Sequence, residues 1–220
     1  MQLSTTTLAT DANLKGYWRF EGNSNDSSGA GHNGADTAIS YSSTIPKYLQ
    51  NASFNGSTSL ISIPTSSDFA PAVYSLAFWC YITTGGVSNW VFGKDTFGSR
   101  QFVMGLDAAN KLYAEHAGGV CTAESGNAIS INRWHHCVIV FSGGTWSALY
   151  IDGVPQTLNI SGTPTVLSNV ATPLTIGKRT FVTDPGFFNG LLDDVAWFTR
   201  ALTSTEVLLL YQQGFSGAII

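Results

Sequence analysis

Short segments rich in aromatic and β-branched residues alternate along the chain with turns rich in Gly, Asn, Asp and Ser. This alternation is typical of antiparallel strands in a β-sandwich or a β-barrel. It predicts strands over residues 17–21, 53–54, 60–63, 75–82, 90–94, 101–107, 111–116, 134–142, 146–151, 174–177 and 191–199.

One helix is predicted near the end of the chain. Thr203 is followed three residues later by Glu206, which is the spacing of a capping box, and an apolar run then leads to Gly214. We therefore expect a short helix that packs on the strands.

The domain organisation follows from length and composition. A chain of 220 residues without an internal repeat, a linker or a change in composition favours a single domain. We assign residues 14–220 to this all-β domain and residues 1–13, which are rich in Ser and Thr and lack a pattern, to a flexible N-terminal segment.

Charge narrows the classes of partner. Only 11% of the residues are charged, the formal net charge is -4, and no cluster of Lys and Arg occurs, so nucleic acid is not an expected partner. The apolar runs have the length of strands, which predicts no membrane insertion. The first residues lack the features of a signal peptide. If the protein works outside the cell or on the surface of a particle, as we expect, export must use a removed leader, a longer parent chain or another route.

The three cysteines do not form a disulfide framework. Cys80 and Cys137 lie in apolar strand patterns and are expected to be small buried side chains. Cys121 lies in a Gly-rich stretch, which we interpret as a loop with a free thiol.

Six motifs in order carry a resemblance to a known family. They are G-Y-W-R-F-E-G from residue 16, A-S-F-N-G-S-T-S-L-I-S-I-P from 52, Y-S-L-A-F-W-C-Y-I from 74, R-W-H-H-C-V-I-V-F from 133, A-L-Y-I-D-G-V from 148 and F-N-G-L-L-D-D-V-A-W-F-T-R-A-L from 188. Together the motifs resemble the laminin-G-like, concanavalin A-like lectin/glucanase domains, over about residues 14–214. The resemblance implies an antiparallel jelly roll of two stacked sheets. It also implies that the strands of Cys80 and Cys137 are neighbours, out of register for the disulfide of pentraxins, so we predict no disulfide.

Catalysis is not expected. The related glucanases carry two catalytic Glu residues in one strand as E-x-D-x-x-E, and no two of Glu21, Glu115, Glu124 and Glu206 have this spacing. No G-x-S-x-G motif is present either. We expect one of His135 and His136 to face inward and form hydrogen bonds.

Asp193 is the main candidate for a structural calcium ligand. The resemblance implies that the first and last strands are antiparallel neighbours, and in the related glucanases an Asp in this last-strand position binds calcium. Further oxygen ligands offered by position alone are Glu21, Asn23, Asp26 and Asn33. The alternative is that the carboxylate accepts hydrogen bonds from loop amides or pairs with Arg200. Strand alternation predicts that Asp193 and Asp194 point to opposite faces, with Asp194 in the structural role.

A sugar site is predicted around one tight turn and a nearby strand. Lectin sites combine an aromatic platform with a few polar groups. The candidates are Trp90, Asp95, Phe97, Arg100 and Tyr113, and among the tryptophans only Trp90 has an exposed-looking context.

These observations favour a non-catalytic recognition module that binds a glycan or a cell-surface protein. The alternative is a structural or attachment module, which forms homo-oligomers or joins a larger assembly such as a viral particle or a surface filament.

Overall fold

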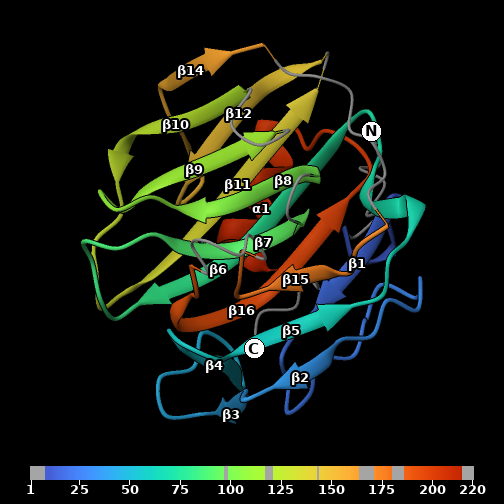
Figure 1. Cartoon of the computed structure of the whole chain (residues 1–220), viewed down its shortest axis with the longest axis vertical. Coiled ribbons are helices and arrows are strands. Elements are labelled where there is room, and N and C mark those ends of the chain that lie inside the picture. The colour runs from blue at the N-terminus through green and yellow to red at the C-terminus, as the bar shows by residue number, and fades with distance from the viewer. Residues whose placement is uncertain are drawn as a thin grey trace, which may run out of the picture.

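The chain folds into two antiparallel sheets of eight strands each, one over the other (Figure 1). The computed structural model describes residues 8–96, 99–116, 121–142, 144–163, 171–179 and 186–214, with the backbone alone at 96, 99 and 100. The predicted all-β jelly-roll architecture is confirmed.

The first sheet contains the last strand of the chain near its centre. Its order is β13 (Val154–Pro155), β12 (Thr145–Ile151), β11 (Trp134–Ser142), β6 (Tyr74–Ile82), β16 (Asn189–Phe198), β4 (Asn51–Asn55) and β3 (Ser40–Ser42), and β1 (Leu14–Trp18) also pairs with β16. Trp18 lies opposite Val195 in the antiparallel pair of β1 and β16. The first and last strands are therefore neighbours, as the resemblance implied.

The second sheet is built mainly from the middle of the chain. Its order is β14 (Leu158–Gly162), β10 (Cys121–Ala128), β9 (Lys111–His116), β8 (Ser99–Leu106), β7 (Asn89–Thr96), β15 (Leu174–Ile176), β5 (Leu60–Ile63) and β2 (Ala35–Thr37). Two short 3-10 helices, η1 (Leu8–Thr10) and η2 (Ser67–Phe69), precede β1 and β6.

A continuous aromatic core fills the space between the sheets. The ring of Trp197 on β16 stacks on those of Phe92 and Phe102, with centroids 5.4 Å apart in each case. All three side chains are at most 1% exposed. Burial of each such side chain stabilises the fold by roughly 1.5–3 kcal/mol.

Helix α1 (Ser204–Gln213) covers the outer face of the first sheet and lies behind the strands in Figure 1. The predicted capping box is confirmed, because Glu206 N–H donates to Thr203 Oγ1 and Thr203 N–H donates to the Glu206 carboxylate. Val207 and Leu210 are the buried residues of the helix. They pack in a second apolar cluster with residues such as Phe198. No described helix has the length and the apolar character needed to span a membrane.

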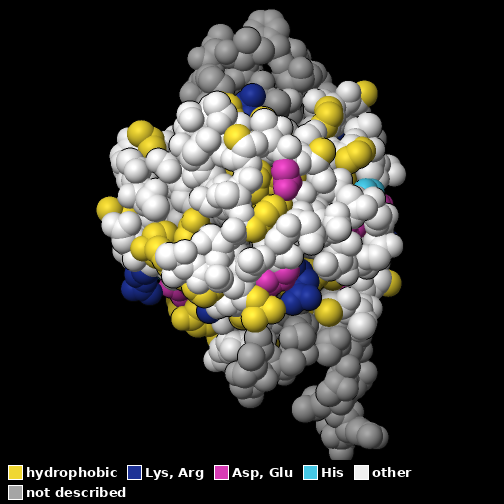
Figure 2. All heavy atoms as spheres, turned by 90° about the horizontal axis from the view of Figure 1, so that it is seen from below, with side chains coloured by type: hydrophobic (Ala, Val, Ile, Leu, Met, Phe, Trp, Pro, Cys, Tyr) yellow, Lys and Arg dark blue, Asp and Glu magenta, His cyan; other side chains and the backbone are white. Residues whose placement is uncertain are grey.

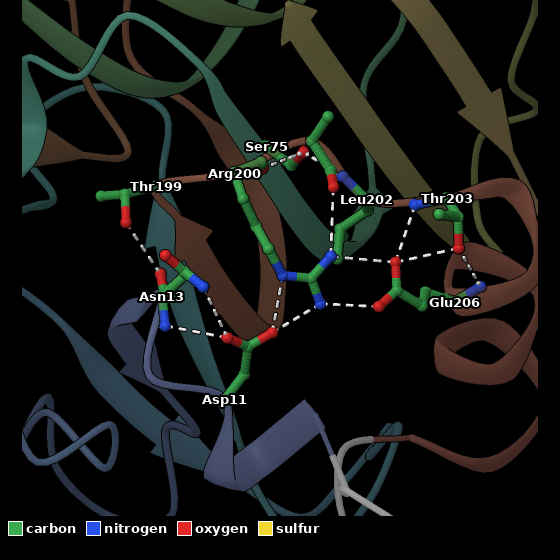
Figure 3. A network of polar contacts seen from close by, with 9 residues as sticks. Asp11, Asn13, Ser75, Thr199, Arg200, Leu202, Thr203 and Glu206 are labelled. Carbon is green, nitrogen blue, oxygen red and sulfur yellow. Dashed lines mark hydrogen bonds and ion pairs between the residues drawn. The ribbon is translucent and has the colours of Figure 1, made fainter. Parts of the chain in front are cut away.

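A charged clasp joins the N-terminal segment to the end of β16 and to α1 (Figure 3). Arg200 Nε donates to Asp11 at 2.7 Å, and its two terminal nitrogens donate to Glu206 at 3.0 and 2.6 Å. Thr199 N–H donates to the carbonyl of Asn13 at 2.9 Å. The described part of the segment predicted to be flexible, residues 8–13, is thus held against the domain.

The cysteines differ from their predicted settings at one position. Cys80 and Cys137 lie on the paired strands β6 and β11, as the resemblance implied. Cys121 is not in a loop but on β10, where its side chain is fully buried. This strand escaped prediction because its sequence, C-T-A-E-S-G-N-A, is rich in residues that are usually found in turns.

Candidate functional site

Two aromatic side chains lie on the outer face of the second sheet. Trp90 on β7 and Tyr113 on β9 flank Gly105 of β8 in register, and their rings meet edge to face at 5.7 Å. A Cβ at Gly105 would lie 2.3 Å from the carbonyl oxygen of Asn89, so this position has no room for a side chain. The aromatic pair therefore spans the backbone of the middle strand.

An arginine links this pair to two acidic side chains. Arg179, just after β15, has its guanidinium 5.1 Å from the Trp90 ring centroid. It lies 3.8 Å from Asp95 Oδ2 and 3.6 Å from Glu115 Oε1. We call Trp90, Asp95, Tyr113, Glu115 and Arg179 the outer-face cluster.

The outer-face cluster is largely removed from water. Asp95 is fully buried, and Trp90, Glu115 and Arg179 are 4%, 6% and 9% exposed. Tyr113 is only half-buried; its hydroxyl donates to Glu115 at 3.4 Å, and burial, followed by the charge of Glu115, raises the pKa of Tyr113 to about 12. Tyr113 is therefore the member of the cluster that is most available to a ligand.

The predicted exposure of Trp90 is wrong. Gly186 lies directly over the indole, since a Cβ there would be 2.3 Å from Trp90 Nε1. Arg179 N–H donates to the carbonyl of Gly186 at 3.0 Å, which fixes the two residues beside each other over Trp90. Sequence context suggested exposure because it shows the neighbouring turn but not the distant segment that covers the ring.

Three of the five predicted sugar-site residues lie close together in the structure. Trp90, Asp95 and Tyr113 belong to the outer-face cluster, whereas Phe97 lies outside the described residues and Arg100 is described by its backbone alone, opposite Asp95. Arg179 was not predicted as a site residue, because it follows a strand distant in sequence from the others.

One lysine beside the cluster faces the other way. Lys94 pairs with Phe102, a core residue, and thus points between the sheets. Its side chain is fully buried, and this burial lowers the pKa of Lys94 to about 8.

A β-bulge brings Asp193 and Asp194 onto the same face, which corrects the prediction that they point apart. The register of β16 against β6 shifts after Asp193, and Asp194 has a φ of 46°. Leu192 and Val195 on either side both belong to the inner core. The two carboxylates therefore share the outer face of the first sheet.

This aspartate pair is held by donors from distant segments. Tyr17 Oη donates to Asp194 at 2.7 Å, and Asp193 accepts the amide hydrogens of Asp194 at 2.8 Å and Tyr48 at 3.3 Å. Burial, then the charge of Asp194, raises the pKa of Asp193 to about 8. Burial raises the pKa of Asp194 to about 6, although the bond from Tyr17 lowers it. The predicted partner Arg200 instead bonds to Asp11 and Glu206.

The other predicted metal ligands divide into two places. Glu21 follows a left-handed residue, Phe20 with a φ of 59°, after β1 has ended. It accepts the Gln50 amide hydrogen at 2.9 Å. Its negative charge contributes to the raised pKa values of Asp193 and Asp194.

Asp26 lies on the other side of β1 from β16, bridged to Trp18. Its oxygens accept three backbone amides and the Ser28 hydroxyl, and its own amide donates to Asn33 Oδ1 at 2.9 Å. Asn23 caps its own turn by accepting the amide hydrogen of Asn25.

β1 lies between Asp26 and the aspartate pair, so the predicted ligands stand in two groups. Among the described residues, no group of three or more His, Cys, Asp or Glu side chains has the arrangement of a metal site. Calcium binding through Asp193 stays a prediction.

The paired histidines hold a turn together. His135 Nδ1 lies 2.8 Å from Asp152, and Nε2 lies 3.0 Å from the hydroxyl and 3.2 Å from the amide nitrogen of Ser130. The prediction of an inward, hydrogen-bonded histidine is confirmed by His135, which is 5% exposed. Burial also keeps His136 neutral by lowering its pKa to about 3.

Charged groups are sparse on the surface. On the face shown in Figure 2, uncharged groups predominate, and acidic and basic side chains adjoin in its lower part.

Comparison with known proteins places the fold. The chain resembles domain 4 of AbnA, an extracellular GH43 arabinanase from Geobacillus stearothermophilus, solved in complex with arabinotriose; the TM-score is 0.71 at 22% identity, over 91% of this chain and 98% of that one. It also resembles the binding domain of Paraclostridial Mosquitocidal Protein 1, with a TM-score of 0.73 at 16% identity over 95% of this chain and 53% of that one.

A more distant part-match is Trypanosoma rangeli sialidase, with a TM-score of 0.65 at 16% identity over 91% of this chain but only 33% of the sialidase. No curated protein matches the sequence significantly. The family model of the concanavalin A-like lectin/glucanases superfamily, laminin G type 3, matches residues 55–208. With these strands, this core and this match, the chain belongs to the concanavalin A-like lectin/glucanases superfamily.

Proposed function

We propose that this protein is a non-catalytic carbohydrate-binding module whose glycan site is the outer-face cluster. The observation that carries the proposal is the joint position of Tyr113, Glu115 and Arg179 on one face of the second sheet. A half-exposed aromatic ring there adjoins an ion-pair network that is already oriented.

The chemistry of the cluster suits a sugar. The C–H groups of a sugar ring pack on an aromatic side chain, and its hydroxyls bond to planar carboxylate and guanidinium groups. Because Arg179 lies near both Asp95 and Glu115, these groups lose little entropy when they meet a ligand. Lys111, on the same strand as Tyr113, and Glu124, opposite Tyr113 on β10, form a partly exposed ion pair that extends this polar face.

Two of the compared structures support a binding function of this kind. The arabinanase domain that shares this fold was solved with arabinotriose, and the toxin domain is a binding domain. The missing glucanase motif supports binding without catalysis. We also propose an extracellular or particle-surface location. The alternative function is attachment within a larger assembly.

The test is isothermal titration calorimetry after a glycan-array screen that includes arabino-oligosaccharides. Tyr113→Ala should weaken binding by about 10-fold or more, which corresponds to about 1.4 kcal/mol. Tyr113→Phe should retain most of the affinity, because the ring is kept.

Tyr41→Ala is the matched control. Tyr41 is another half-buried tyrosine whose hydroxyl bonds to an acidic side chain, Asp36, but it lies on β3 of the other sheet. Equal affinities for wild type, Tyr113→Ala and Glu115→Gln would refute the proposed site. A lack of binding to every glycan would refute the proposed function.

A further inference from the structure

β14 is an edge strand with unusual exposure. Among the described residues it pairs only with β10, and Figure 1 shows it at the upper margin of the molecule. Four of its five residues are exposed, including Ile160 at 45%.

The strands at the other ends of the two sheet orders, β13, β3 and β2, are protected by their length or composition, and β14 is not. β13 has two residues and ends in Pro155, and β2 and β3 have three residues each. β14 has five residues, L-N-I-S-G, without a charge or a proline. Folded proteins normally shorten, charge or cover such an edge, since its free backbone groups can pair with another strand.

The backbone groups that point outward can be identified. Gly126 N–H donates to the carbonyl of Thr157 at 2.8 Å, so these two residues form a hydrogen-bonded pair just before β14. In an antiparallel ladder such pairs recur every second residue, which places Asn159 opposite Glu124 and Ser161 opposite Thr122 as the next pairs. The N–H and C=O groups of Leu158, Ile160 and Gly162 therefore face away from β10.

We propose that β14 pairs antiparallel with β14 of a second copy of this chain across a two-fold axis, with Ile160 opposite Ile160. The three outward-facing residues are centred on Ile160, so the strand is complementary to itself in this register. Asn159 would then lie opposite Ser161 of the second copy, and no charges would oppose each other. On the adjoining strands the charges of Lys111 and Glu124 are already paired.

This pairing would supply about six main-chain hydrogen bonds and join two eight-stranded sheets into one. The outer faces of both second sheets would then lie on the same side. Two weak sites presented together can bind a repetitive surface far more tightly than one. The dimer itself depends on no ligand, so it stands or fails independently of the proposed glycan site.

Sedimentation velocity from about 10 μM to 1 mM tests the pairing. Wild type should sediment increasingly as a dimer, whereas Ile160→Lys and Ile160→Glu should each stay monomeric, because like charges would meet at the axis. An equimolar mixture of the two variants should regain the dimer, because lysine then faces glutamate.

Val154→Lys is the matched control. It introduces the same charge at a residue that is 58% exposed on β13, the edge of the other sheet, and should leave the dimer unchanged. Circular dichroism of each variant checks the fold. A monomeric wild type at 1 mM, a dimer unaffected by Ile160→Lys, or a mixture that stays monomeric would each overturn the proposal.

Discussion

Arg200→Met removes the centre of the clasp in Figure 3 while it keeps most of the apolar stem. The side chains involved are only partly exposed, at 26% for Arg200, 13% for Asp11 and 25% for Glu206. Without the guanidinium, the two carboxylates lose their common partner in a partly desolvated place. A fully buried pair broken in this way costs about 3–5 kcal/mol, and we scale this to about 2–3 kcal/mol for the observed exposure.

Differential scanning calorimetry at pH 7 provides the measurement. At about 2–4 °C per kcal/mol for a domain of this size, the melting temperature should fall by about 4–12 °C. A double-mutant cycle with Asp11→Asn should show a coupling of at least about 1 kcal/mol. A fall of less than about 2 °C, or additive effects of the two substitutions, would refute the reasoning.

The clasp also makes a prediction for acid. Burial alone would raise the pKa of Asp11 and of Glu206, but the bonds to Arg200 and to nearby amides outweigh it and lower both pKa values. Lowered folded-state pKa values stabilise the fold above the unfolded pKa values, and this stability is lost as the pH falls through the folded ones. Arg200→Met should therefore differ least from wild type at the lowest pH.

Three further predictions concern other parts of the molecule. The pKa values of Asp193 and Asp194 are raised to about 8 and about 6, so their contribution to stability is present below about pH 4 and is lost as the pH rises to about 8. The melting temperature of the wild type should therefore fall from pH 5 to pH 9, and that of Asp193→Asn should fall less. An equal fall in both proteins would contradict this prediction. Gly105→Ala should cost about 1–3 kcal/mol in urea unfolding, since its Cβ would meet the Asn89 carbonyl at 2.3 Å, whereas Gly126→Ala, with no atom nearer than 3.2 Å, serves as the control. If calcium binds at Asp193, the melting temperature should rise with added calcium and fall with a chelator. An unchanged melting temperature would refute the calcium site.

Local patterns in the sequence were sufficient for most strands, the helix and the family. The strands at 60–63, 111–116 and 134–142 have their predicted bounds, because a strand between two packed faces needs regular apolar positions and turn residues at its ends. The helix begins at the predicted capping box, which is a contact between residues three apart. Such features depend on near neighbours, and the sequence displays near neighbours directly.

The candidate site depended on contacts between distant segments. Gly186 covers Trp90, and Arg179 joins Asp95 to Glu115, although these residues lie far apart in the chain. The bulge at Asp193 changed the face of the next residue, because one extra residue in a ladder reverses the alternation that the sequence predicts. The sequence by itself determined the sandwich and its core. Only the tertiary structure decided which polar residues meet, because burial and pairing are set by strands brought together from distant parts of the chain.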